Sequence, residues 1–326
     1  MIETPNFNEI PNLKKSVLED CINLLGLHPS NGVNKNLILL NLKGCKNRRK
    51  LPSKFEMESL DILILSNCSK VKRIPEFGKN MECVLVLYLD GTAITKLPTS
   101  IGNLTSLTSL GLRDCKNLMS LPSTFFNMKT LENVNLSGCL KLCKLLENLG
   151  TVESVENIDL SGTAKRPMSY SNAPFQTLKK LIFGGSKARS PDPMSLLSTS
   201  LLGLCSLTNL DLSYCNLKAI PSDIGCLFSL KHLSENNFGY LPESIAQLSN
   251  LRHLCVMNCK NLRLLPKLPL NICHIWGYGC TSLETVPNLL NLDSLGWIAL
   301  LLSNCSKLAN KQGLIDIFLA VIRKHL

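Results

Sequence analysis

The chain has 326 residues, of which 45% are apolar, 5% aromatic and 18% charged, and its formal net charge is +11. This apolar fraction can supply a hydrophobic core, and the composition argues against a disordered acidic tail or a coiled coil. No apolar run reaches the ~18 residues that a membrane helix needs, and the first residues lack the basic and apolar regions of a secretory signal. Neither a membrane protein nor a secreted disulfide scaffold is therefore expected, despite 15 cysteines.

A pattern of leucines around a cysteine recurs along the chain. Its clearest copy, residues 107–122, follows the frame LxxLxLxxCxxLxxLP, and residues 60–75 and 251–266 repeat it. This is the frame of a leucine-rich repeat, with cysteine where many such repeats carry asparagine. The cysteine column is occupied thirteen times, by Cys21, Cys45, Cys68, Thr92, Cys115, Cys139, Thr163, Ser186, Cys215, Asn236, Cys259, Cys280 and Cys305.

These repeats predict an α/β fold, a leucine-rich-repeat solenoid of about 13 repeats. Each LxxLxLxx segment is a short strand whose leucines point inward while the residues between them point outward. One repeat cannot bury its leucines alone, so neighbours stack into a parallel β-sheet over a shared core. We expect a curved horseshoe with the sheet on its concave face and short helices or irregular turns on its convex face.

The frame also predicts the domain organisation, one repeat domain over residues 1–310. Residues 163–206 lose the frame and are rich in proline and serine, so they are interpreted as an irregular insertion, either an exposed loop or a partner-binding one. Residues 230–238 are two residues short of the frame, which should thin that turn. Ser16 and Arg48 stand where the frame has leucine. Residues 311–326 place apolar residues on one helix face and predict a C-terminal helical tail.

Cysteine in the column has a structural explanation. Asparagine at this position can hydrogen-bond to neighbouring backbone, and cysteine is a small, readily buried substitute with a weak S–H donor. Consecutive column cysteines are stacked neighbours, but nothing in the sequence indicates an oxidising compartment. We therefore expect reduced thiols in the core.

The outward strand positions are the candidate protein-binding surface. Aromatic and arginine side chains are the most frequent binding anchors, which favours Trp276, Tyr278, Tyr88 and Arg113. The alternative is that these positions are ordinary exposed surface. The candidates on the concave face are Tyr88, Asp90, Arg113, Asp159, Asp211, His253, Met257, Trp276 and Tyr278.

Six repeats place a lysine one or two residues after the column, and stacking should align these lysines along one edge. This basic rim could dock an acidic surface in a salt-dependent way, or it could serve solubility alone. Nucleic-acid binding is not expected, because no aromatic ladder accompanies the charges. The rim comprises Lys46, Lys70, Lys116, Lys141, Lys260 and Lys307, with Arg48, Arg49 and Lys50 beside it.

Three histidines share one frame position in successive repeats: His232, His253 and His274. Stacked strands lie ~4.8 Å apart, so the imidazoles should form a ladder on the concave face. They could hold Zn²⁺ with Cys255 as a fourth ligand, but an incidental, solvated ladder without metal is the favoured interpretation, so no metal and no cofactor is expected. The shortening after Leu233 should disturb the first step of the ladder.

The cysteine-column repeats resemble the leucine-rich-repeat region of plant intracellular immune receptors built from TIR, NB-ARC and repeat domains. The resemblance rests on residues 40–47 (LNLKGCKN), 89–94 (LDGTAI), 210–217 (LDLSYCNL) and 241–245 (LPESI). No GxxxxGK[ST] phosphate loop occurs, so the NB-ARC domain is expected to be absent. No TIR domain is expected before the repeats either, and the chain is expected to be a fragment or truncated relative.

The resemblance implies a non-enzymatic recognition scaffold in the cytoplasm or the nucleus, with the sensing and autoinhibitory role of that region. The implied partners are a pathogen effector or a guarded host protein, and the NB-ARC domain of a parent receptor. An intracellular repeat adaptor, either a ubiquitin-ligase substrate receptor or a small-GTPase-binding protein, remains the alternative. A receptor ectodomain fits less well, because the sequence lacks the LxGxIP return and a signal peptide. No catalytic constellation stands outside the repeat frame.

Overall fold

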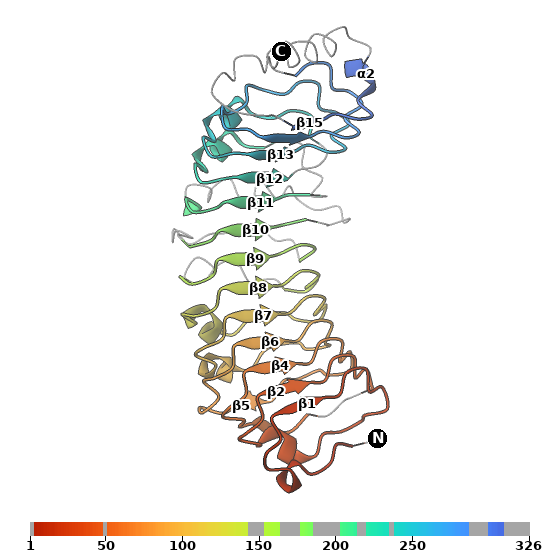
Figure 1. The fold of residues 1–326 in the computed structure, drawn as a ribbon, viewed down its shortest axis with the longest axis vertical. Helices are drawn as coiled ribbons and strands as arrows, with labels where there is room; N and C mark the ends of the chain where they lie inside the picture. The colour runs from red at the N-terminus through yellow and green to blue at the C-terminus, as the bar shows by residue number, and fades with distance from the viewer. Residues whose placement is uncertain are drawn as a thin grey trace. The chain divides into compact units, whose positions relative to one another are not determined.

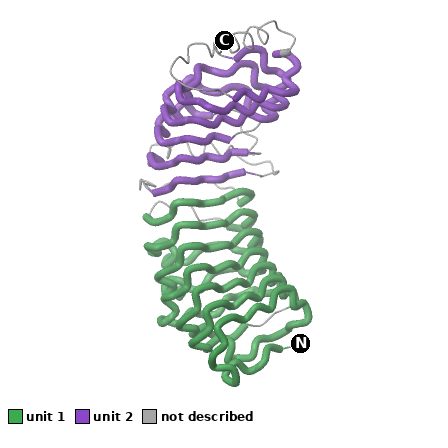
Figure 2. Tube along the Cα trace, viewed as in Figure 1, with its two compact units in different colours: residues 1–173 green, residues 174–326 purple. Residues whose placement is uncertain are grey.

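The computed structural model describes residues 3–47, 51–142, 153–163, 177–184, 203–213, 220–234, 238–286 and 299–309. The chain divides into two compact units, residues 1–173 (unit 1) and residues 174–326 (unit 2), coloured separately in Figure 2. Each unit is a stack of similar turns that contributes one short strand per turn to a parallel sheet (Figure 1).

In unit 1, seven three-residue strands pair in parallel, and the middle residue of each faces the middle residue of the next. These middle side chains point inward: Leu63 and Leu87 have 0% exposure. The core of unit 1 therefore lies directly beneath its sheet. The strands are β1 (Lys15–Val17), β2 (Leu39–Asn41), β4 (Ile62–Ile64), β6 (Val86–Tyr88), β7 (Ser109–Gly111), β8 (Asn133–Asn135) and β9 (Asn157–Asp159).

Unit 2 repeats this arrangement with six strands in its described residues. The middle residues are again buried, except Leu300 in the last strand, which is half-buried. The strands are β10 (Lys180–Ile182), β11 (Asn209–Asp211), β12 (His232–Ser234), β13 (His253–Cys255), β14 (His274–Trp276) and β15 (Ala299–Leu301).

The strands follow the cysteine frame. Each ends four residues before its column residue, as Ile64 does before Cys68, except β12, which ends two residues before Asn236. One strand thus corresponds to each predicted repeat, and the predicted solenoid with its parallel sheet is confirmed. The expectation that the shortened repeat disturbs its strand is wrong: β12 pairs in register with β11 and β13, because the missing residues fall after the strand.

Short helices and turns return the chain from one strand to the next. Four of the 3₁₀ helices start after a proline N-cap and bury one large side chain, as Ile101 and Phe125 do. In two other turns of unit 1 short strands replace the helix, and Phe55 packs against Phe77 with ring centroids 6.2 Å apart. The return elements are η1 (Phe7–Glu9), η2 (Pro29–Gly32), β3 (Lys54–Phe55), β5 (Glu76–Phe77), η3 (Thr99–Asn103), η4 (Ser123–Asn127), η7 (Ser222–Cys226), η8 (Glu243–Gln247) and α2 (Ser306–Ala309).

The residue before each column position, where the structure describes it, turns the chain through a left-handed conformation. Ten described residues at this position have φ between +55° and +75°, and all are glycine, asparagine or aspartate. In several successive turns, asparagine or aspartate at this position alternates with glycine. A Cβ on Gly91 would lie 2.5 Å from Oδ1 of Asn67 in the preceding turn, and one on Gly279 would lie 2.7 Å from Oδ1 of Asn258. Glycine at these two positions therefore adopts a positive φ without strain and leaves space for the asparagine of the preceding turn.

The column cysteines link adjacent turns as thiols. The Sγ–H of Cys68 donates to the carbonyl oxygen of Leu42 in the preceding turn, and the same bond recurs at 2.9 to 3.2 Å in both units. Burial raises the pKa of Cys115 to about 11 and that of Cys139 to about 12. A thiol with so high a pKa is a poor nucleophile at neutral pH, so these cysteines are structural. The other donors are Cys45, Cys115, Cys139, Cys280 and Cys305.

Some sequence predictions concern segments outside the described residues. These are the C-terminal tail 311–326, Arg48 to Lys50, the column residues Ser186, Cys215 and Asn236, and most of the insertion 163–206. Of that insertion, residues 163, 177–184 and 203–206 are described, and they include β10.

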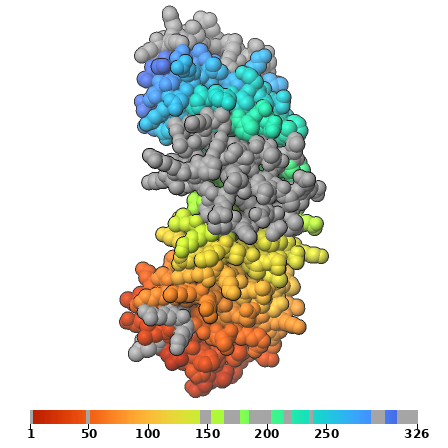
Figure 3. Space-filling view, turned by 180° about the vertical axis from the view of Figure 1, so that it is seen from behind, coloured from red at the N-terminus to blue at the C-terminus, as the bar shows by residue number. Residues whose placement is uncertain are grey.

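Successive described turns of unit 1, red through orange to yellow, lie directly against one another in the space-filling view (Figure 3).

Candidate functional site

The outer face of each sheet follows directly from the alternation of side chains along a strand. The middle residue of each strand points into the core, so the first and third residues point away from it, as does the second residue after the strand. These outward positions make little contribution to the core and are free to vary in chemistry. They are therefore the first place to look for a binding surface.

In unit 1, the predicted residues Tyr88, Asp90, Arg113 and Asp159 all occupy outward positions. Two of the carboxylates have structural partners. Asp90 accepts hydrogen bonds from the Ser66 hydroxyl at 3.0 Å and from the backbone N–H of Arg113 at 2.8 Å. Asp159 accepts from a backbone N–H two residues further on, at 2.9 Å. Both carboxylates thus stabilise the turns that carry them.

In unit 2, the predicted residues Asp211, His253, Met257, Trp276 and Tyr278 also lie at outward positions. Met257 is 40% exposed and Tyr278 49% exposed. Asp211 resembles Asp159, because it accepts the backbone N–H of Ser213 at 2.8 Å. The aromatic candidates belong to β14 and the turn after it.

Sequence reasoning missed a group of aliphatic side chains on the outer face of unit 1. Leu39, Ile62 and Val86 are direct cross-strand neighbours in β2, β4 and β6, and Ile64 lies beside Tyr88. These four residues, the aliphatic block, are partly exposed, and Tyr88 at their border is 36% exposed. The signal was present in the sequence, since the frame calls for variable residues at these positions and aliphatic ones occupy them. The candidates chosen there were aromatic, charged or methionine side chains, and no aliphatic residue was among them.

The three histidines form a stacked column on the outer face of unit 2. His232 is the cross-strand neighbour of His253, and His253 of His274. Ring centroids are 4.2 Å apart for the first pair and 4.7 Å for the second, with interplanar angles of 4° and 11°. Trp276 stacks on His253 and His274, with centroids 5.6 Å apart in both cases. We call the three histidines the histidine ladder.

Burial and neighbouring charges lower the pKa of two histidines of the ladder. Burial lowers the pKa of His232, and the positive charge of Lys231 adds to this. Burial also lowers the pKa of His253, followed by repulsion from the imidazoles on either side and from Arg252. These two rings are therefore more strongly neutral near pH 7 than an exposed histidine would be.

The zinc hypothesis for the ladder does not fit this geometry. Nitrogen lone pairs lie in the plane of an imidazole ring, and three nearly parallel planes cannot direct them at one ion, as tetrahedral zinc requires. Among the described residues, no group of three or more histidine, cysteine, aspartate or glutamate side chains could hold a metal ion. The ladder is a stack of aromatic rings rather than a ligand set.

The lysines of the basic rim are exposed in both units. Lys70 donates to Oδ1 of Asn47 in the preceding turn at 2.6 Å, and Lys141 donates to Oδ1 of Asn117 at 3.1 Å. Lys307 lies 3.6 Å from a carboxylate oxygen of Glu284. Lys46, Lys116 and Lys260 are also exposed. In each unit the rim is thus tied to its neighbouring turns while its ammonium groups stay at the surface.

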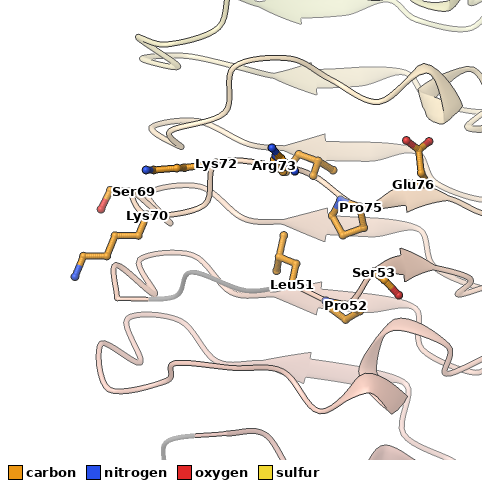
Figure 4. A pocket seen from close by; sticks show the side chains of 10 residues that line it. Leu51, Pro52, Ser53, Ser69, Lys70, Lys72, Arg73, Pro75 and Glu76 are labelled. Carbon is orange, nitrogen blue, oxygen red and sulfur yellow. The ribbon is translucent and has the colours of Figure 1, made fainter.

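A groove of about 800 Å³ lies beside the rim in unit 1, between the return segments of two successive turns (Figure 4). Lys72 and Arg73 contribute positive charge in addition to Lys70, and neither forms an ion pair with a described residue. The only carboxylate of the lining, that of Glu76, accepts a hydrogen bond from Ser100. The lining consists of Leu51, Pro52, Ser53, Ser69, Lys70, Lys72, Arg73, Ile74, Pro75 and Glu76.

Family models and curated relatives show which kind of leucine-rich repeat this chain resembles. Residues 56–182 match a family model described as "Disease resistance protein RPS4B-like, leucine-rich repeats", and residues 206–227 match the general Leucine Rich Repeat model. The TMV resistance protein N of Nicotiana glutinosa is 38% identical over 84% of this chain and 24% of its own length. The disease resistance-like protein DSC1 of Arabidopsis thaliana is 37% identical over 84% of this chain and 17% of its own length.

The chain spans a quarter or less of the length of these curated relatives. Among solved structures, a leucine-rich-repeat protein of Leptospira interrogans is 24% identical, with a TM-score of 0.44 over 79% of this chain and 70% of that one. Within the described residues, no helix has the length and apolarity to cross a membrane.

Proposed function

Because this chain is a leucine-rich-repeat region of the plant disease-resistance type, we propose that it is a non-enzymatic scaffold that recognises a protein during pathogen sensing. The partner would be a pathogen effector or a host protein that an effector alters. This activity would take place in the cytoplasm or the nucleus. An intracellular repeat adaptor is the alternative, and it would use the same surface for a different partner.

The aliphatic block is the observation that carries the proposal. It places four aliphatic side chains next to one another at positions that face solvent, and the core needs none of them. Contiguous exposed apolar surface on a folded protein commonly marks an interaction site. Burying a fully exposed aliphatic side chain contributes about 1.5–3 kcal/mol, and because these four are already partly buried, each would add only a fraction of that before the costs of association.

The basic rim supports a second contact within the same function. Lys70, Lys72 and Arg73 bring three cations to one groove, and an acidic protein surface would complement them. In a receptor that contains an NB-ARC domain, that domain is the proposed occupant of the rim. Such a contact would hold the repeats against the nucleotide-binding switch and would weaken as salt is added.

The test is pairwise binding of the purified chain to a panel of pathogen effectors and their host targets, with an Ile62→Ser/Ile64→Ser double variant. We expect the variant to lose at least about tenfold in affinity for the recognised partner, since it removes apolar area from the centre of the contact. Its thermal stability should change little, because both side chains lie outside the core.

An Ile22→Ser/Leu25→Ser double variant is the matched control. It makes the same chemical change at two exposed apolar residues of unit 1 that lie outside the sheet, each 51% exposed. The control should bind as the unmodified chain does. Equal binding by both double variants would contradict the proposal, as would failure of the chain to bind any member of a broad panel.

A further inference from the structure

The outer sheet face of unit 2 carries an excess of positive charge. Four cations stand on its strands or directly before them, in β10 to β13: Lys179, Lys180, Lys231 and Arg252. Asp211 is the only carboxylate among the described outward residues of this face, and a backbone N–H already occupies one of its oxygens. The outer face of unit 1 differs, because Asp61, Asp90, Glu132, Glu156 and Asp159 accompany its cations.

The histidine ladder adds a row of hydrogen-bond donors to this cationic face. The Nδ1 atoms of His253 and His274 are buried and have no hydrogen-bond partner. A proton on such a nitrogen would be buried without an acceptor, which is more costly than a buried lone pair, so the neutral rings carry their proton on Nε2. The stacking then places these two Nε2–H groups side by side, because the centroids of the two rings are 4.7 Å apart.

We propose that the outer face of β11 to β14 is a binding site for an acidic protein segment, whose carboxylates accept hydrogen bonds from the ladder and pair with Lys231 and Arg252. The inference rests on the proposed recognition function and deepens it by naming the chemistry of the partner. It also makes recognition dependent on pH. Charge complementarity is the reason for choosing an acidic partner over an apolar one here.

The direction of the pH dependence follows from the protonation of His232 and His253 in the chain without its partner. Burial holds the pKa of His232 and of His253 below 6.5, so both rings are mostly neutral at pH 7. A carboxylate placed beside a ring favours its charged form and raises its pKa. Binding therefore takes up protons and strengthens as the pH falls from 7 toward 5. The charged and titratable groups that share this face are Lys179, Lys180, Asp211, Lys231, Arg252, Cys255, Cys273 and Tyr278.

A short polyaspartate peptide is the probe, because its carboxylates stay ionised down to about pH 5. Its affinity for the full chain would be measured by calorimetry at about pH 7.5 and about pH 5.5, with circular dichroism to verify the fold at both. We expect affinity to be up to about tenfold higher at the lower pH, since a rise of one unit in the pKa of a single ring contributes at most a factor of ten.

Two variants separate the titrating groups from the permanent charges. His253→Gln should bind the peptide at both pH values but with a weaker pH dependence, because one of the two rings with a lowered pKa is gone. Lys231→Gln/Arg252→Gln should weaken binding at both pH values and keep that dependence. Lys267→Gln, which removes an exposed cation of unit 2 outside the sheet, is the control and should behave as the unmodified chain. NMR should show the pKa values of His232 and His253 rising when the peptide is added.

Three results would overturn the inference: equal affinity at both pH values, an unchanged pH dependence in His253→Gln, or tighter binding of an oligonucleotide of the same charge. The last would mean that the face prefers a nucleic acid to an acidic protein segment. A failure here is distinguishable from a failure of the proposed function, because the Ile62→Ser/Ile64→Ser variant tests recognition on unit 1. Loss of binding in that variant with no effect of ladder substitutions would leave the recognition function and remove only the acidic partner.

Discussion

Two regions of the chain, β2 to β6 in unit 1 and β12 to β14 in unit 2, have inner faces of the same kind and outer faces of different chemistry. Inside, both bury leucine at the middle of most strands, and column residues hydrogen-bond to the turn before. Outside, the first region presents Leu39, Ile62 and Val86 where the second presents the histidine ladder. The parallel, in-register pairing is the same in both regions, and the chemistry of the outward strand positions differs.

This difference shows how a repeat protein separates stability from recognition. An inward residue must fit the side chains of the turns before and after it, whereas an outward residue meets mainly solvent and its cross-strand neighbours. Aliphatic and imidazole rows can therefore occupy the same frame position in one chain. Substitutions of inward residues should therefore act alike in the two regions, and substitutions of outward residues should not.

The largest expected effect comes from the shared inner face. Leu63→Ala in β4 and Leu254→Ala in β13 each remove a side chain of 0% exposure, so each should lower the free energy of unfolding by about 2–5 kcal/mol. Substituting the outward neighbours, Ile62→Ala and His253→Ala, should cost less than about 1 kcal/mol. Urea unfolding of the four variants measures both. An outward substitution as costly as its inward neighbour would break the distinction between the faces.

A smaller effect is expected at the glycine turns, again alike in the two regions. Gly91→Ala and Gly279→Ala place a side chain at positive φ, which costs about 1–2 kcal/mol, and each new Cβ meets the side chain of the preceding turn. Removing that side chain in a double variant, Asn67→Gly/Gly91→Ala or Asn258→Gly/Gly279→Ala, should recover only the steric part. Denaturant midpoints test this, and additive costs in both double variants would show that the alternation has no steric origin.

The smallest expected effect is a dependence of folding stability on pH that arises in the region with the histidine ladder and not in the region with the aliphatic block. The pKa of His232 and of His253 lies below 6.5 in the folded chain, so between 6.5 and those lower values the unfolded chain binds more protons. Stability is therefore complete above about pH 6.5 and declines as the pH falls through that window. Urea midpoints at about pH 7.5 and about pH 5.5 should differ less for His253→Gln than for the unmodified chain. If the urea midpoints of Ile62→Ala differ between the two pH values as much as those of the unmodified chain, the pH dependence of stability arises outside the aliphatic block.

Much of this architecture was predictable because leucine spacing is a local property. The frame around Cys68 located β4, and the frame around Cys259 located β13, since inward and outward residues alternate within a few positions of the chain. The same logic correctly placed the histidines in one column. It failed for the shortened repeat, where the sequence shows that two residues are missing but not whether the strand or the turn after it is shorter.

The sequence by itself determined the strands, their stacking order and the identity of the outward residues, because each of these depends on periodicity alone. Only the tertiary structure decided how neighbouring outward side chains meet. It showed that Asp90 and Asp159 are held by the turns around them, that parallel imidazoles cannot converge on zinc, and that two Nδ1 atoms lie buried without a partner. Ring orientation and hydrogen-bond direction depend on atoms contributed by adjacent turns, more than twenty residues away in the chain, and no local pattern encodes them.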